Sequence, residues 1–214
     1  MQAGINDTAD SKCLPNRIGI MADSHGDVTA LESAVGFLNK AGCGTLYHLG
    51  DICESTLPET VAPCVSVIQD NNVLAVKGNN EHTVSLNTAE NDESAIALFL
   101  GRLPMVRVLP GALFTHSLPF EKDLGLSAMI RALTDEATRF FFRQHPGDVL
   151  FRGHSHAPVL MHEKGGAVLS IPISLTASTP LAPCRPCIIT AGALTDGLCM
   201  TWDTVTDEIR LHSI

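Results

Sequence analysis

Apolar and polar positions follow two different rhythms along the chain. In the first half, short apolar runs alternate with segments whose apolar residues recur every three to four positions, a pattern typical of strands separated by amphipathic helices. The strand-like runs are residues 17–22, 45–49 and 72–77, and the helix-like segments are residues 28–40, 59–70 and 93–101. This order predicts βαβ units and therefore an α/β fold.

The second half of the chain becomes richer in strands. Strands are expected around Val106, around Leu113 and at residues 148–152. An amphipathic helix is expected at residues 127–143, before the last of these strands. From Val159 onward, short apolar runs are separated by glycine-containing turns at residues 164–166 and 195–197. Such turns are typical of antiparallel hairpins, so the chain is expected to end mostly in β-structure.

Length and composition are compatible with one packed domain. The chain has 214 residues, of which 45% are hydrophobic and 17% charged, as in globular proteins. Residues 1–16 are polar and are expected to form a tail before a domain of residues 17–214. The tail lacks the apolar core of an export signal, and no run approaches the roughly 18 apolar residues of a membrane span. Seven scattered cysteines do not suggest a disulfide framework, so we expect a cytoplasmic protein.

The overall charge limits the class of ligand. The formal net charge of −9 at pH 7 repels polyanions, which excludes loose electrostatic binding to nucleic acid or to an anionic membrane. A phosphate substrate would have to be attracted locally, and bound divalent cations supply such a local positive charge. The composition is therefore compatible with a metal-centred phosphate enzyme.

Residues with metal-ligand chemistry follow the first two predicted strands. Asp23 and His25 come directly after the first strand, and residues two apart in an extended segment lie on the same side, where they can share one metal ion. The second strand is followed by Gly50, which permits a tight turn, and by Asp51, whose carboxylate could bridge two ions. Either motif alone occurs often by chance and does not by itself predict a metal site.

The same arrangement recurs at three further predicted strands. Asn79 follows the third strand and offers an amide oxygen, a ligand that hard and borderline metals accept. His116 follows a later apolar strand, and His154 and His156 follow the strand at residues 148–152. Five strand ends that each deliver Asp, Asn or His make chance an unsatisfactory explanation, so the sequence predicts a metal site.

These motifs resemble the signature of a known enzyme family. D-x-H at residues 23–25, G-D at 50–51, G-N-x-E at 78–81, T-H at 115–116 and G-H-x-H at 153–156 look like the signature of the calcineurin-like metallophosphoesterase superfamily. The compact length and the hairpin-rich end make the chain most similar to the small prokaryotic phosphodiesterases of that superfamily. The resemblance implies a four-layer αββα sandwich, in which two mixed β-sheets are flanked by helices and the end of the chain contributes to the second sheet.

The resemblance also implies the ligands of two divalent ions. The first ion would take Asp23, His25, Asp51 and His156, and the second would take Asp51, Asn79, His116 and His154. Asp51 would bridge the two ions, and Asp51, Asn79 and His116 are the residues expected to matter most for catalysis. Imidazole, carboxylate and amide ligands without thiolate suit Mn²⁺, Fe or Zn²⁺, and the resemblance favours Mn²⁺.

The implied function is that of a binuclear-metal-dependent phosphoesterase. We expect a phosphodiesterase that hydrolyses a small soluble phosphodiester through attack by a hydroxide bridging the metal ions, without a phospho-enzyme. A phosphomonoesterase is the nearest alternative, and a non-catalytic protein-interaction scaffold of the same fold is the alternative from another class. The presence of all seven ligands favours the enzyme. The expected partner is a small phosphoester substrate, and we expect neither stable binding to nucleic acid nor association with a membrane. The sequence leaves open whether the protein forms a homo-oligomer. Substrate choice is expected to depend on loops at residues 81–91 and 117–125.

One position departs from the family pattern. Many relatives carry a histidine, thought to protonate the leaving group, where this chain has Asn80. The resemblance therefore leaves the general acid unassigned, with His82 and His48 as candidates. Glu81 is interpreted as a carboxylate that supports the site and not as a catalyst.

Two other features receive a structural interpretation. Cys184 and Cys187 match C-x-x-C, but they follow a proline-rich turn and do not open a helix, so a redox or structural zinc function is a distant third hypothesis. Arg152 and Lys77 adjoin the ligand motifs and could touch a substrate phosphate. Because cations at strand edges are usually solvated, we leave both out of the predicted site.

Overall fold

The structure is a computed structural model that describes residues 15–87, 94–118 and 130–214. Its elements, in chain order, are β1 (Arg17–Met21), α1 (Val28–Lys40), β2 (Thr45–His48), η1 (Pro58–Thr60), α2 (Val61–Asp70), β3 (Leu74–Ala75), α3 (Asn79–Asn87), α4 (Ala95–Arg102), β4 (Val106–Leu109), β5 (Ala112–Thr115), α6 (Asp135–Gln144), β6 (Val149–Arg152), β7 (Val159–Lys164), β8 (Ala167–Pro172), β9 (Thr179–Pro180), η2 (Ala182–Cys184), β10 (Cys187–Thr190), η3 (Leu194–Asp196), β11 (Leu198–Asp203) and β12 (Glu208–Ser213). Among the described helices, none is long and apolar enough to cross a membrane.

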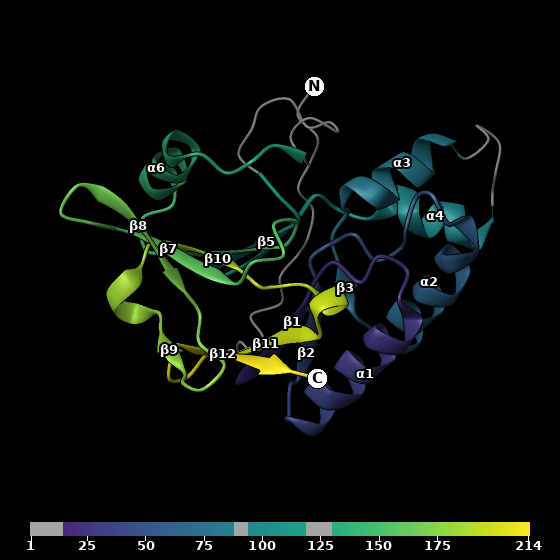
Figure 1. Ribbon diagram of the computed structural model, residues 1–214, viewed down its shortest axis with the longest axis horizontal. Helices are drawn as coiled ribbons and strands as arrows, with labels where there is room; N and C mark the ends of the chain where they lie inside the picture. Colours follow the sequence, from purple (N-terminus) through teal and green to yellow (C-terminus); the bar gives the residue numbers. More distant parts are fainter. Residues whose placement is uncertain (1–14, 88–93, 119–129) are drawn as a thin grey trace.

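The strands form two mixed sheets that face each other (Figure 1). The first sheet has the order β3-β2-β1-β11-β12-β9, and the second has the order β4-β5-β6-β10-β7-β8. In the first sheet β1 pairs in parallel with β2, and β2 with β3, as βαβ units require. In the second sheet β5, β6 and β10 are parallel neighbours. The parallel strands of each sheet thus end at a common edge.

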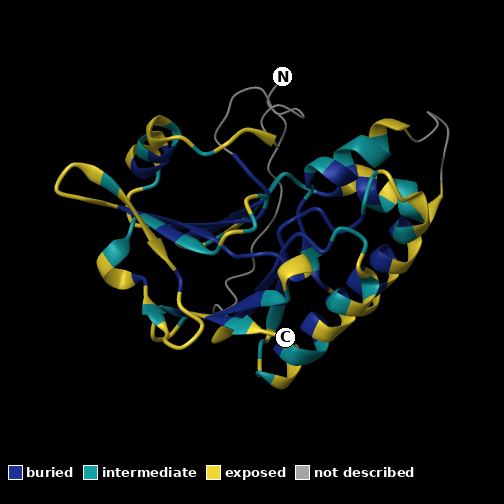
Figure 2. Ribbon diagram, in the orientation of Figure 1, coloured by how far each residue is buried: buried dark blue, intermediate teal, exposed yellow. Residues whose placement is uncertain are grey.

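The core between the sheets is apolar and contains a series of contacting aromatic rings. Ile18 and Ile20 of β1 alternate with residues on the helix side, as the two-residue repeat of a strand requires. The ring of Tyr47 in the first sheet stacks on Phe114 in the second, with ring centroids 3.9 Å apart. In Figure 2 many of the strand residues of both sheets have the dark blue of buried residues. The apolar face of each sheet therefore holds the sandwich together.

Helices cover the outer faces of both sheets. A second core cluster lies between the first sheet and α1, α2 and α4, and includes Leu31, Leu38 and Ile68. On the second sheet, Phe141 and Phe142 of α6 pack against Leu150 of β6 and its neighbours. The side chain of Asp27 caps α1 by accepting a hydrogen bond from the Ala30 N–H, and α1 has the bounds that the sequence predicts. The molecule has the four layers expected for an αββα sandwich.

The segment after the second strand differs from the expectation. β3 contains only Leu74 and Ala75, although a strand was expected over residues 72–77. The prediction of a loop at residues 81–91 is wrong for residues 81–87, because α3 continues to Asn87. The polar sequence of α3 has no clear apolar repeat, and its start is fixed by tertiary contacts of Glu81 with the turn after β2. Residues 88–91 lie outside the described residues.

The long helix predicted at residues 127–143 is interrupted in the structure. Ile130 is helical, residues 131–134 are not, and α6 begins at Asp135, where the side chain of Thr134 accepts a hydrogen bond from the Ala137 N–H. Its predicted start at residues 127–129, the tail up to residue 14 and residues 119–125 of the second loop lie outside the described residues.

Only one of the two glycine turns closes a hairpin. β7 and β8 pair across Gly165 and Gly166, as predicted. The turn at residues 195–197 does not join a hairpin, because it follows β10 of the second sheet and precedes β11 of the first. Gly197, with φ of 68°, ends η3 there and lets the chain cross between the sheets. The last hairpin, β11–β12, therefore completes the first sheet and not the second.

Candidate metal centre

The seven predicted ligands meet at one end of the sandwich. In the first sheet they follow the parallel strands β1, β2 and β3, and in the second they follow β5 and β6. They are Asp23, His25, Asp51, Asn79, His116, His154 and His156. Hydrogen bonds join the two sheets at this end, because the ring of His116 contacts the Leu49 carbonyl and the His154 N–H donates to Asp23. The two halves of the signature thus reach one place from opposite sheets.

An unusual backbone conformation is shared by five of these residues. Positive φ angles of 45° to 69° are found at Asp23, His25, Asp51, His154 and His156. For residues other than glycine this conformation costs roughly 1–3 kcal/mol and is concentrated at functional sites. Backbone hydrogen bonds between the turns help to hold it, with the His25 N–H 3.0 Å from the Asp51 carbonyl oxygen. The fold thus imposes local strain to aim these side chains inward.

One group of potential ligands consists of Asp23, His25 and His156, whose candidate ligand atoms all lie within 4.8 Å of one another. The Nε2 atoms of the two histidines are 3.3 Å apart. His156 Nε2 lies 3.8 Å from Asp23 Oδ1, and His25 Nε2 lies 3.9 Å from Asp51 Oδ2. Asp51 therefore adjoins the group expected to hold the first ion.

A second group consists of Asp51, His116 and His154, again with ligand atoms within 4.8 Å of one another. His116 Nε2 lies 3.5 Å from Asp51 Oδ1 and 3.0 Å from Asn79 Oδ1. Asp51 thus contacts members of both groups, as a bridging ligand must. The geometry brings together the residues that the sequence assigns to each ion, and their binding of metal stays a prediction.

The hydrogen-bond chemistry of His116 fits a cation. Its Nδ1 lies 2.8 Å from the Leu49 carbonyl oxygen and must donate there, so a neutral ring presents a lone pair at Nε2. Burial lowers the pKa of His116 to about 4, which keeps the ring neutral at pH 7. This lone pair faces the oxygens of Asn79 and Asp51, which are acceptors as well. Acceptors without an intervening hydrogen repel one another, and a bound cation would turn that repulsion into coordination.

The buried carboxylates of the site also indicate a bound cation. Asp23, Asp51 and Glu81 are at most 2% exposed. Burial, followed by the neighbouring Asp51 charge, raises the pKa of Asp23 well above its usual range. Burying a carboxylate is unfavourable unless the charge is paired. A divalent ion would supply the missing charge.

The structure assigns a supporting role to Glu54, which no sequence motif marks, and to Asn80, which the sequence marks only as a departure from the family pattern. Glu54 Oε2 lies 3.2 Å from His25 Nδ1, so it orients the ring and leaves Nε2 for a metal. Asn80 is only 6% exposed and contacts Asp51. The third supporting residue, Glu81, was anticipated, and it accepts hydrogen bonds from the backbone N–H groups of Gly78 and Asp51.

The cations beside the motifs behave differently from each other. The sequence suggested a solvated Arg152, but in the structure this residue is only 2% exposed. It lies two residues after Leu150 and therefore on the same face of the second sheet, which α6 covers. Its Nη1 donates to Ser155 Oγ, while Nε and Nη2 have no hydrogen-bond partner within the described part of the chain. Burial lowers its pKa to about 10, so it remains charged. Lys77 instead donates to the Gly101 carbonyl oxygen of α4.

The candidates for other chemistry are largely set aside. His48 is fully buried, contacts Ser24, and has its pKa lowered by burial to about 3, so it cannot deliver a proton to a substrate. His82 lies three residues after Asn79 in α3 and therefore on the same face of that helix, so it stays a candidate. Cys184 and Cys187 are free thiols, and burial raises the pKa of Cys187 to about 12, which opposes redox reactivity.

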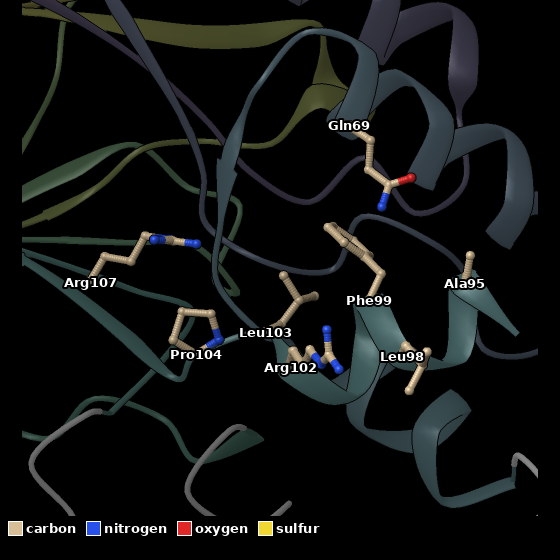
Figure 3. Close-up of a pocket in the computed structure, with 8 residues that line it drawn as sticks. All are labelled: Gln69, Ala95, Leu98, Phe99, Arg102, Leu103, Pro104 and Arg107. Carbon is tan, nitrogen blue, oxygen red and sulfur yellow. The ribbon is translucent and has the colours of Figure 1, made fainter. Parts of the chain in front are cut away.

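A separate hollow of about 430 Å³ lies beside the molecule's helical layer and not at this centre (Figure 3). It is lined by Gln69, Ala95, Leu98, Phe99, Arg102, Leu103, Pro104 and Arg107. None of the seven predicted ligands belongs to this lining. The hollow therefore does not bear on the predicted chemistry.

Comparison with known families agrees with the resemblance inferred from the motifs. A family model described as the calcineurin-like phosphoesterase superfamily domain matches residues 17–189. An uncharacterized protein of Methanocaldococcus jannaschii is 27% identical, over 71% of this chain and 67% of that protein.

Solved structures share the fold at low sequence identity. A metallophosphoesterase from Sphaerobacter thermophilus has a TM-score of 0.73 and 19% identity, covering 92% of this chain and 88% of that one. A hypothetical protein from Pyrococcus horikoshii has a TM-score of 0.60 and 13% identity, covering 92% and 87%. A structure described as a novel archaeal phosphodiesterase has a TM-score of 0.52 and 16% identity, covering 92% and 99%. These matches confirm the predicted sandwich of two mixed sheets flanked by helices.

Proposed function

Because this chain belongs to the calcineurin-like phosphoesterase superfamily, we propose that it is a binuclear-metal-dependent phosphodiesterase acting on a small soluble phosphodiester. The observation that carries the proposal is the pair of ligand groups that share Asp51 at one end of the sandwich. Family membership supports a phosphoester hydrolase, and the paired groups support two ions. The preference for diesters rests on the likeness of the compact chain to small prokaryotic phosphodiesterases.

The ligand assignment follows the two groups. Asp23, His25, Asp51 and His156 would hold one ion, and Asp51, Asn79, His116 and His154 would hold the other. When bound, two such ions activate a water molecule and polarise the phosphoryl oxygens. The absence of thiolates among the proposed ligands suits Mn²⁺, Fe or Zn²⁺, and the resemblance to the family favours Mn²⁺.

The chain's own residues prepare this centre. Glu54 and the Leu49 carbonyl fix His25 and His116 in the tautomers that direct Nε2 toward the ligand groups. The His154 N–H holds Asp23 at 2.9 Å. Arg152 adds a buried positive charge close enough to lower the pKa of His154, after the larger effect of burial. Together these contacts orient the donor atoms before a substrate arrives.

The leaving group receives no proton from the position after Asn79. Asn80 has no acidic hydrogen, and His48 is buried and neutral. His82 is the remaining candidate donor from the sequence. Substrates with weakly basic leaving groups should therefore react fastest, which favours nitrophenyl esters as the first probes.

Two other functions remain as alternatives. A phosphomonoesterase would use the same centre. A protein-interaction scaffold would need no metal, but buried carboxylates without a counter-charge would then destabilise the fold without benefit. We further propose a small phosphoester as the partner and a reducing cytoplasm as the location, on the basis of the acidic charge and the free thiols.

The deciding experiment measures metal content and hydrolysis on one sample. Metal-free protein is reconstituted with Mn²⁺, analysed for bound metal, and assayed with bis-nitrophenyl phosphate and nitrophenyl phosphate. We expect close to two ions per chain and a higher kcat/KM for the diester. Two ions with a preference for the monoester would support the phosphomonoesterase instead, and a protein without bound metal under saturating conditions would support the scaffold.

A further inference from the structure

Asn80 occupies an unusual position beside the shared ligand. It is the second residue of α3, directly after Asn79, and only 6% of it is exposed. Its backbone N–H donates to Asp51 Oδ1 at 2.9 Å, and its side-chain Nδ2 donates to Asp51 Oδ2, also at 2.9 Å. One residue therefore contacts both oxygens of the carboxylate that lies between the two ligand groups.

A third hydrogen bond fixes which way the Asn80 amide points. The backbone N–H of Ser55 donates to Asn80 Oδ1 at 2.9 Å. Because an N–H group needs an acceptor, the oxygen of the amide must face Ser55 and the NH₂ group must face Asp51. The amide is thus held between the turn after β2 and the Asp51 side chain, and it cannot rotate without losing two hydrogen bonds.

We infer that Asn80 is a positioning residue that fixes the plane of the Asp51 carboxylate across both metal positions. The inference rests on the proposed function, since it assumes that Asp51 is shared by two ions. A carboxylate held at both oxygens keeps its remaining lone pairs directed at the two ligand groups. This pre-orientation lowers the entropic cost of binding a second ion, as contacts to metal ligands generally do.

The same contacts exclude a role for the Asn80 position in donating a proton to the leaving group. The side chain is buried, its Oδ1 accepts from Ser55, and its Nδ2 donates to Asp51 and lies 3.4 Å from His25 Nδ1. A group placed here for proton donation would have to give up the contact that orients Asp51. The chain therefore uses this position for holding the ligand and not for acid catalysis.

The test is a Mn²⁺ titration of metal-free protein by calorimetry. Asn80→Ala keeps the backbone N–H contact and removes the side-chain contacts, so we expect the second Mn²⁺ to bind at least about 10-fold more weakly than in the wild type. Asn71→Ala is the matched control, because its amide also donates one hydrogen bond, to the Val67 carbonyl oxygen, but contacts no predicted ligand. The control should bind both ions as the wild type does.

A second measurement separates positioning from simple support of the fold. The rise in Tm caused by Mn²⁺ is recorded for the wild type, Asn80→Ala, Asn80→Ser and Asn71→Ala. We expect a smaller rise in both Asn80 variants, even if their metal-free Tm is also lower. A rise equal to that of the wild type, together with unchanged affinity for the second ion, would overturn the inference while leaving the proposed function intact. A wild-type protein that binds no Mn²⁺ would overturn both.

Discussion

Asp23 and Asp207 lie at opposite ends of the sandwich, and both have a left-handed backbone, with φ of 55° and 53°. Asp207, in the turn between β11 and β12, accepts two hydrogen bonds of 2.8 Å from Arg185 and one from the Trp202 indole N–H. Arg185 therefore lowers the pKa of Asp207. Within the described part of the chain no cation hydrogen-bonds to Asp23; burial and then the Asp51 charge raise its pKa, against the smaller effects of the His154 N–H and the Arg152 charge.

The difference shows how one residue type serves two purposes. At the Asp207 end the chain supplies the cation itself, and Arg185 also donates to the carbonyls of Gly111 and Gly147. That network ties the final hairpin to turns of the second sheet and serves the fold. At the Asp23 end the acidic and histidine side chains converge, and the buried Arg152 acts on Asp23 through its charge without a hydrogen bond to it. A divalent ion from outside the chain would supply the remaining positive charge.

The largest effect is expected from replacing a predicted metal ligand at the Asp23 end of the sandwich. We expect Asp51→Asn and His116→Ala each to lower kcat by at least about 100-fold, since each disturbs the ions that stabilise developing phosphoryl charge. The assay is bis-nitrophenyl phosphate hydrolysis at saturating Mn²⁺, with circular dichroism to show that the fold survives.

Cys184→Ser is the matched control for activity, and it should leave hydrolysis nearly unchanged. If this variant abolished hydrolysis while His116→Ala did not, the metal-dependent mechanism would be wrong.

At the opposite end, Arg185→Met should act on stability and not on chemistry. It removes the partner of a partly buried carboxylate, so we expect the free energy of unfolding to fall by about 2 kcal/mol. Urea denaturation measures this loss, and kcat and Mn²⁺ content should stay at the wild-type values. A large loss of activity in the folded variant would show that the two ends are coupled.

Glu54 offers a subtler change at the metal end. Glu54→Gln weakens the contact that fixes the His25 tautomer, and we expect Mn²⁺ affinity to fall about 10-fold. Calorimetric titration gives the affinity, and Glu59→Gln, on the surface turn η1, is the control. Unchanged affinity in Glu54→Gln would mean that the ring is oriented by other contacts.

The smallest expected effect is a pH dependence with opposite sign at the two ends. A raised pKa in the folded state means that Asp23 ionises at a cost, so the stability of metal-free protein falls as pH rises from about 4 through the folded pKa. Asp23→Asn should therefore stabilise the metal-free protein by about 1 kcal/mol at pH 7.5 and by less at pH 4.5.

Asp207→Asn should show the reverse. Its lowered pKa contributes stability that is present above about pH 4 and is lost as pH falls through the folded pKa. The variant should therefore be less stable than the wild type at pH 7.5. Urea unfolding in a chelating buffer measures both variants, and a destabilised Asp23→Asn at pH 7.5 would contradict the view that this carboxylate lacks a partner.

Sequence patterns predicted much of the fold because local preferences and tertiary structure agree there. The periodic apolar residues of α1, the capping Asp27 and the glycine turn between β7 and β8 all act over a few residues. The family signature also selected seven predicted ligands, six of which form the two groups and the seventh of which, Asn79, contacts His116. The start of α6 and the nature of α3 were not predictable, since capping by Thr134 and anchoring by Glu81 decide them against a weak or misleading periodicity.

The sequence by itself determined which chemical groups this protein offers, their order along the strands and the family to which it belongs, because these follow from residue identity and short-range spacing. The tertiary structure decided which groups are left without a counter-charge. Only the tertiary structure buries Arg152 and Asp23, sets Glu54 against His25 across neighbouring strand ends of the first sheet, and places Asn80 on both oxygens of Asp51 at the next strand end. These are contacts between residues far apart in the chain, and their energies depend on burial and distance, which no local pattern encodes.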